Sequence, residues 1–115
     1  TTRYPVLYLL DGHFGFPAAV AARAAMGIQR EVADVIIVGI GNGEHTFDTW
    51  FMNRWRDYTP SLNMAADSAG ARAFGLPPDA VRSGGAADFL RVLREEVIPH
   101  VERMYRTSRD AVVRR

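Results

Sequence analysis

The sequence predicts an α/β fold built on a βαβ unit, with parallel strands near residues 4–10 and 34–40. The runs VLYLL and VIIV are apolar without alternation, which is typical of strands buried on both faces of a parallel sheet. The stretch between the two runs is dense in alanine and favours a helix. A strand, a helix and a second strand in this order place both strand ends on one edge of the sheet, where open α/β sheets bind their ligands.

The helices follow from composition and spacing. We expect the crossover helix near residues 17–32, with Pro17 in its first turn. Residues 63–83 are small and rich in helix breakers, and we expect a surface excursion there with one short helical turn. Near residues 84–105 apolar side chains recur every three or four positions, which predicts a long amphipathic helix with a kink or a break at Pro99. The last residues, DAVVRR, could begin another strand.

Composition limits the class of protein. The 115 residues suit one small domain, and the net charge of +1 indicates no nucleic-acid partner. No cysteine is present, and no apolar run approaches the roughly 20 residues of a membrane span, so we expect a soluble chain. The compartment stays undetermined, because a removed signal peptide would leave no trace.

Acyl transfer requires a nucleophile, a base and donors for the developing oxyanion. Gly12 follows the first strand directly, and a glycine there lets the backbone turn so that the amide of His13 points into the edge. The alternative is a plain turn. No serine lies in a strand–turn–helix elbow; Ser68, in AADSAG, comes closest but has no preceding strand.

Other sites were weighed from the residue pattern. Asp11, His13, Glu44 and His45 would share the same edge, but no metal-ligand spacing supports a site, and hydrogen bonding in a loop explains them better. The glycines of residues 39–43 do not complete a dinucleotide motif, and HTFDTWF does not open an obvious helix. We therefore predict neither a metal nor a cofactor.

An aromatic segment follows the second strand. It contains Phe47, Trp50, Phe51, Trp55 and Tyr58, interleaved with arginines and Asp57. Such a segment either lines an apolar pocket or pins a long loop onto the core. Pinning, with an arginine and Asp57 as the polar tie, is the interpretation we favour.

Three runs in order, YPVLYLLDGH, VIIVGIGNGEHTFDTWFMNRWRDYTPS and GGAADFLRVLREEVIPHVERMYRT, resemble the putative-esterase branch of the α/β-hydrolases, which contains enterochelin-esterase-like and esterase-D-like enzymes. The resemblance implies a serine hydrolase of small-molecule esters with a Ser, Asp or Glu, His triad and no cofactor. It places an oxyanion donor on the backbone of Gly12 and His13. The substrate-pocket candidates are Asp11, Phe14, Trp50, Trp55, Arg56, Asp57 and Tyr58, because the segment from Arg56 to Pro60 follows a strand and borders the cleft in that family.

The sequence departs from the family pattern at its end. The family's YRT leads into a strand and then the nucleophile elbow, whereas Tyr105, Arg106 and Thr107 are followed here by SRDAVVRR. We therefore expect residues 1–115 to be an incomplete α/β-hydrolase domain, inactive alone because the triad is absent. The alternative function is a non-catalytic module that completes its sheet through unpaired strand edges, by forming a homo-oligomer or by binding a partner chain.

Overall fold

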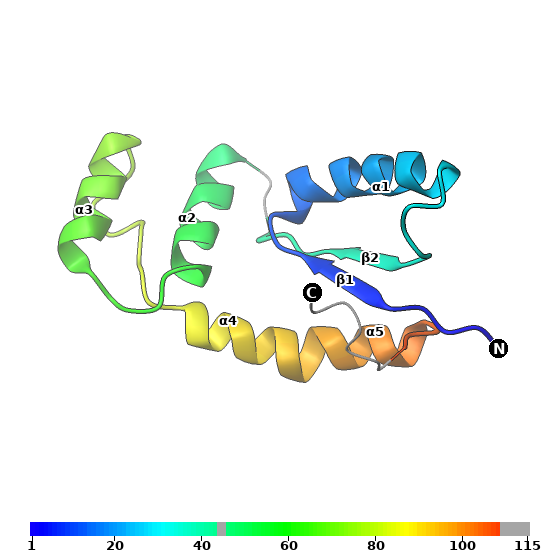
Figure 1. Ribbon diagram of the computed structural model, residues 1–115. Helices are drawn as coiled ribbons and strands as arrows, with labels where there is room; N and C mark the ends of the chain where they lie inside the picture. Colours follow the sequence, from blue (N-terminus) through cyan, green and yellow to red (C-terminus); the bar gives the residue numbers. More distant parts are fainter. Residues whose placement is uncertain (44–45, 109–115) are drawn as a thin grey trace. The chain divides into compact units, whose positions relative to one another are not determined.

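The structure, a computed structural model, describes residues 1–43 and 46–108 (Figure 1). These residues form two compact units, and each is described by itself. The first, the α/β unit, comprises Thr1–Gly41 together with the chain from His100 onward. The second, the helical unit, comprises Asn42–Pro99.

The α/β unit contains the predicted βαβ arrangement. Strands β1 (Val6–Leu9) and β2 (Ile36–Gly39) pair in parallel, with Val6 opposite Ile36 and Leu9 opposite Gly39. Helix α1 (Gly12–Ile28) connects them and lies along the pair (Figure 1). The prediction of a mixed α/β fold with two parallel strands and a crossover helix is confirmed.

A third backbone segment adjoins β1. Tyr4 forms an isolated parallel bridge with Thr107, and its N–H donates to the carbonyl of Arg106 at 2.9 Å. The chain leaving the last helix therefore runs beside the start of β1. The strand predicted for DAVVRR lies outside the described residues.

Two expectations about this unit were wrong. The strands are half-buried rather than buried on both faces, and Leu7 is 37% exposed. Helix α1 starts at Gly12, so Pro17 lies inside it and not in its first turn. The helix begins early because Asp11 adopts a left-handed conformation (φ 51°, ψ 43°) that turns the chain directly from strand into helix.

The helical unit begins with two capped helices. Helix α2 (Phe47–Asp57) starts after Thr46, whose hydroxyl accepts the N–H of Thr49 at 3.2 Å. Helix α3 (Met64–Ala73) starts after Asn63, whose side-chain oxygen accepts the N–H of Ala66 at 3.0 Å. The sequence interpretation, a long aromatic loop and a surface excursion, was wrong for both segments. Polar caps of this kind satisfy the first N–H groups of a helix and fix its start.

The long C-terminal helix is present with an irregular centre. It consists of α4 (Ala86–Val92), a π-helical turn η1 (Leu93–Val97) and α5 (Ile98–Met104). The N–H of Ile98 donates to the carbonyl of Leu93, five residues earlier, immediately before Pro99. Proline lacks an N–H and crowds the carbonyl four residues before it, and the wider turn accommodates that defect.

Candidate active-site edge

The turn after β1 is shaped by the close approach of two backbones. A side chain could not be accommodated at Gly12, since an added Cβ would lie 2.6 Å from the nitrogen of Ile40. The N–H of Gly12 donates to the carbonyl of Ile40 at 2.9 Å, and the N–H of Ile40 donates to Leu9 at 2.8 Å. The carboxyl ends of both strands are thereby joined at one edge, as the sequence predicted.

Helix α1 begins at this edge, directly after Asp11. The carbonyl of Asp11 accepts the N–H groups of Phe14 and Gly15 at 3.0 and 2.9 Å. The Gly12 amide is already bonded to Ile40, so the candidate oxyanion donor narrows to the backbone of His13. An amide in the first turn of a helix lies in the positive end of the helix dipole, which favours a negatively charged ligand.

Two rings accompany this turn. The rings of His13 and Phe14 meet edge to face with centroids 5.0 Å apart, and Phe14 is 61% exposed. An exposed phenylalanine beside a helix N-terminus can contact the apolar part of a ligand whose charged part meets the amides. Of the four residues weighed as metal ligands, Glu44 and His45 lie outside the described residues. The part of the chain that the structure describes holds no cluster of three or more His, Asp or Glu side chains suited to a metal ion.

The five aromatic residues of the segment after the second strand all lie on α2 or directly after it. Phe51 packs on Phe74 with ring centroids 4.2 Å apart, and Trp55 lies 5.4 Å from Phe51. The guanidinium of Arg54 lies over the rings of Trp50 and Tyr58, at 5.5 and 5.1 Å from their centroids. These contacts agree with the predicted packing of the aromatic segment onto its neighbours, but the segment is a helix and not a loop.

A buried polar network surrounds Asn42, the first residue of the helical unit. Its side-chain N–H donates to Asp57 at 2.8 Å, its side-chain oxygen accepts the hydroxyl of Tyr58 at 3.2 Å, and its carbonyl accepts Asn53 at 2.6 Å. Arg56 completes the network through an ion pair with Asp57, 2.8 Å from Nε to Oδ1. The expected pairing of an arginine with Asp57 is present, but it joins consecutive residues, and Asn42 is what connects Asp57 to another segment.

A second buried carboxylate, Asp67, binds residues 74–85, which join α3 to α4 and are called the return segment below. Its oxygens accept the indole N–H of Trp55 at 2.8 Å and both the N–H and the hydroxyl of Ser83 at 3.1 and 3.0 Å. Burial alone would raise the pKa of Asp67, but the hydrogen bonds from Ser83 and Trp55 and the charge of Arg82 together lower it. Asp67 therefore stays ionised at neutral pH.

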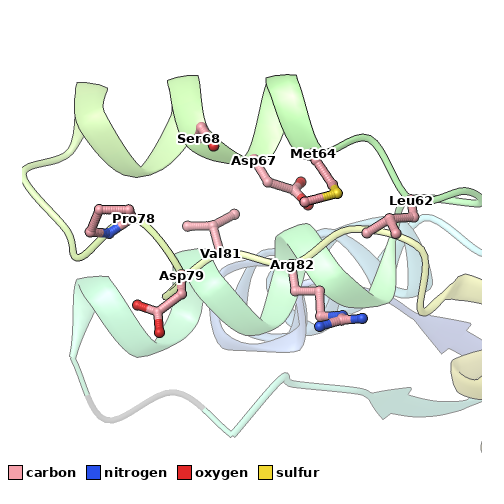
Figure 2. Close-up of a pocket in the computed structure, with 8 residues that line it drawn as sticks. All are labelled: Leu62, Met64, Asp67, Ser68, Pro78, Asp79, Val81 and Arg82. Atoms are coloured by element: carbon pink, nitrogen blue, oxygen red, sulfur yellow. The ribbon is translucent and has the colours of Figure 1, made fainter.

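Beside this carboxylate is a small open pocket (Figure 2). Its volume is about 220 Å³, and α3 and the return segment supply its walls. Ser68 faces it from the interior of α3, without the strand and sharp turn that a nucleophile elbow requires. The lining residues are Leu62, Met64, Asp67, Ser68, Pro78, Asp79, Val81 and Arg82.

Sequence reasoning missed the residues that organise these networks, namely Asn42, Asp67 and Ser83. Asn42 and Asp67 are 6% and 5% exposed. Short-range signals existed, because Asn63 and Asp67 are a helix cap and a first-turn carboxylate. The partners lie 15 and 16 residues apart in the chain, a separation that local patterns do not reveal.

No helix among residues 1–43 and 46–108 has the length and apolar content that crossing a membrane requires. This finding agrees with the absence of a long apolar run in the sequence.

Comparison with known proteins finds an esterase family, an esterase and a serine hydrolase that are similar to this chain. The family model described as "Putative esterase" matches residues 1–114. Ferri-bacillibactin esterase BesA of Bacillus subtilis (strain 168) is 32% identical over 107 residues, which are 92% of this chain and 36% of BesA. The chain thus spans about a third of the length of this relative.

Solved structures agree. The BES protein from Bacillus cereus matches with a TM-score of 0.64 at 28% identity, covering 91% of this chain and 36% of that one. An IroE-like serine hydrolase from Shewanella oneidensis matches with a TM-score of 0.62 at 34% identity, covering 91% of this chain and 30% of that one. By the extent of the family match and the ordered motifs along its two strands and long helix, the chain belongs to the putative esterase family.

Proposed function

We propose that these 115 residues form the oxyanion-binding part of a serine-dependent ester hydrolase with an α/β-hydrolase fold. The observation that carries this proposal is the contact between Gly12 and Ile40. It brings two strand ends together and starts helix α1 directly at the edge, with the His13 amide in its first turn. Ligands of open α/β sheets bind at this kind of edge.

The chemistry assigned to the edge is stabilisation of negative charge. When a nucleophile attacks an ester carbonyl, the carbonyl oxygen becomes an oxyanion, and a fixed N–H directed at that oxygen lowers the barrier. The His13 amide is such a donor, and the dipole of the 17-residue helix α1 adds to its effect. The Gly12–Ile40 hydrogen bond limits movement of the turn, so the donor needs no reorganisation during the reaction.

The attacking serine, its histidine and its acid are assigned to residues outside these 115. Ser68 lies within α3 and lacks the elbow geometry, so we do not assign it the attack. The 115-residue polypeptide alone is then expected to hydrolyse no ester by a serine mechanism.

Candidate substrate contacts are proposed for each unit by itself. In the α/β unit, exposed Phe14 offers an apolar surface beside the oxyanion donor, and Asp11 shapes the turn through its backbone. In the helical unit, Arg56 and Tyr58 are the proposed contacts, and Trp50, Trp55 and Asp57 support them. The class of substrate is a carboxylic ester, in keeping with the family.

The His13 donor can be tested in a protein that joins these residues to a serine-bearing remainder. Replacing His13 by its α-hydroxy acid analogue substitutes an ester oxygen for the backbone N–H and keeps the imidazole. We expect kcat for a p-nitrophenyl ester to fall about 10²- to 10³-fold, the usual effect of losing one oxyanion donor. His13→Ala, which keeps the N–H, is the control and should leave kcat within a few fold. An unchanged kcat after amide replacement would remove the proposed role.

A second candidate function is favoured by the free side of β2. Within the described residues β2 pairs with β1 alone, so its other edge presents unpaired backbone groups. A second copy of the chain or another polypeptide could add a strand there. Light scattering of the purified chain separates the two functions, since a defined oligomer with cooperative unfolding supports the module and a monomer contradicts it.

A further inference from the structure

The ion pair between Arg56 and Asp57 has an unusual geometry for consecutive residues. Arg56 Nε lies 2.8 Å from Oδ1 of Asp57 and Nη2 lies 3.2 Å from Oδ2. Neighbouring side chains on a helix normally point in different directions, so a two-point contact between them requires the guanidinium to fold back onto the carboxylate. Such paired contacts fix the orientation of the guanidinium plane as well as its position.

Asp57 is held in place at the cost of an unfavourable helix position. It is the last residue of α2, where the negative end of the helix dipole disfavours a carboxylate, and it is 9% exposed. The contacts from Arg56 and from Asn42 compensate it, and Tyr58 in turn holds Asn42. The position of the Asp57 carboxylate therefore depends on the donors from Arg56 and Asn42.

The other side of Arg56 faces outward. Its side chain is 53% exposed, and within the described residues Nη1 has no acceptor on the protein. Its stem packs against Gly85, where an added Cβ would lie 2.8 Å from Cγ of Arg56, and the N–H of Gly85 donates to the Arg56 carbonyl at 2.9 Å. The stem of Arg56 is thus packed against Gly85, while the remaining N–H groups of its guanidinium are accessible to a ligand.

We infer that Asp57 is a specificity-determining positioning residue, which cancels the charge of Arg56 and turns the remaining guanidinium N–H groups toward an uncharged oxygen acceptor such as an ester carbonyl. The inference rests on the proposed function in one respect, namely that the natural ligand is an ester. A bare arginine attracts carboxylates most strongly, whereas a neutral Arg–Asp pair donates hydrogen bonds without net charge and repels an approaching anion through Asp57. The pair therefore selects neutral ligands over acids of the same shape.

The test uses the 115-residue chain, titrated with sodium benzoate and with benzamide, its neutral isostere, and followed by NMR at Arg56 Nε–H and Gly85 N–H. In the wild type we expect benzamide to shift both signals at lower concentration than benzoate. In Asp57→Asn we expect benzoate to bind about two- to fivefold more tightly and benzamide to be unchanged, since one partly exposed charge interaction changes affinity by this order. Arg56→Gln combined with Asp57→Asn, followed at the Gly85 N–H, should respond to neither ligand.

Several results would overturn the inference. Equal benzoate binding by the wild type and Asp57→Asn, a wild type that prefers benzoate, or no benzamide response at Arg56 would each do so. If Asp57→Asn does not fold, the wild type still decides, through its benzamide preference and a slowly exchanging Arg56 Nε–H signal. Failure of the proposed function is recognised separately, because it appears as an unchanged kcat after amide replacement at His13.

Discussion

At the scale of single residues, a few positions determine how each of the two units is built. Gly12 allows two backbones to approach, Asp11 supplies the left-handed turn, and Asp57 and Asp67 tie distant segments of the helical unit together. Gly12 and the aromatic residues could be selected from sequence because turns and aromatic density are local features. The buried carboxylate networks could not be, because their partners come from separate segments.

The role of Gly12 predicts a large effect of a small substitution. In Gly12→Ala the new methyl group would lie 2.6 Å from Ile40 N and 2.7 Å from Gly39 C, so the backbone must shift. We expect a loss of about 1–3 kcal/mol in the free energy of unfolding, measured by urea denaturation. Gly15→Ala is the matched control, because its methyl group has a nearest neighbour at 3.5 Å and lies within the helix. That change should stabilise the chain by about 0.5–1 kcal/mol, and equal effects of the two would contradict this view.

The lowered pKa of Asp67 predicts a loss of stability in acid. A carboxylate whose pKa is lower in the folded state contributes stability above its ordinary pKa of 3.8, and this contribution disappears as pH falls below that value through the folded pKa. Asp67→Asn should destabilise the helical unit at neutral pH, and its free energy of unfolding should change less in acid than that of the wild type. Urea unfolding followed by tryptophan fluorescence at each pH measures both effects. Asp88→Asn is the control, since Asp88 is exposed and pairs with Arg91 at 3.2 Å on the surface. Identical pH profiles for wild type and Asp67→Asn would rule out this role.

At the scale of elements, apolar patterns in the sequence predicted strands and helices correctly, whereas the residues that cap two helices were not recognised. The βαβ unit and the amphipathic helix were predicted from apolar runs and spacing. Helices α2 and α3 were missed, because the aromatic and small residues of these segments were interpreted as loops and the N-cap residues Thr46 and Asn63 were not recognised. The predicted kink at Pro99 is replaced by a π-helical turn, an adjustment that depends on packing and cannot be read from the proline alone.

The cap of α2 gives a prediction at this scale. Thr46→Ala removes the hydroxyl that accepts the Thr49 N–H, and should lower the free energy of unfolding by about 1 kcal/mol. Thr46→Ser keeps the oxygen and should change it by only a few tenths of that amount. Thermal or urea unfolding followed by far-UV circular dichroism measures both variants, and equal losses for Ala and Ser would show that the cap is not what starts α2.

At the scale of the whole molecule, family membership and chemical competence are separate matters. The chain matches the family over residues 1–114 and spans about a third of the length of its relative BesA. Among the described residues, the strand edge is observed, whereas the amide donor and the guanidinium contact are proposed. Under the same proposal, hydrolysis requires a protein in which these residues are joined to a serine elbow.

Treatment of the purified 115-residue chain with a fluorophosphonate probe, followed by intact-mass and peptide mass spectrometry, shows whether the chain holds an activated serine. Such probes label a serine only when it is activated as a nucleophile. The account predicts an unmodified mass at every incubation time. A covalent adduct on Ser68, or on any other side chain of the chain, would contradict it.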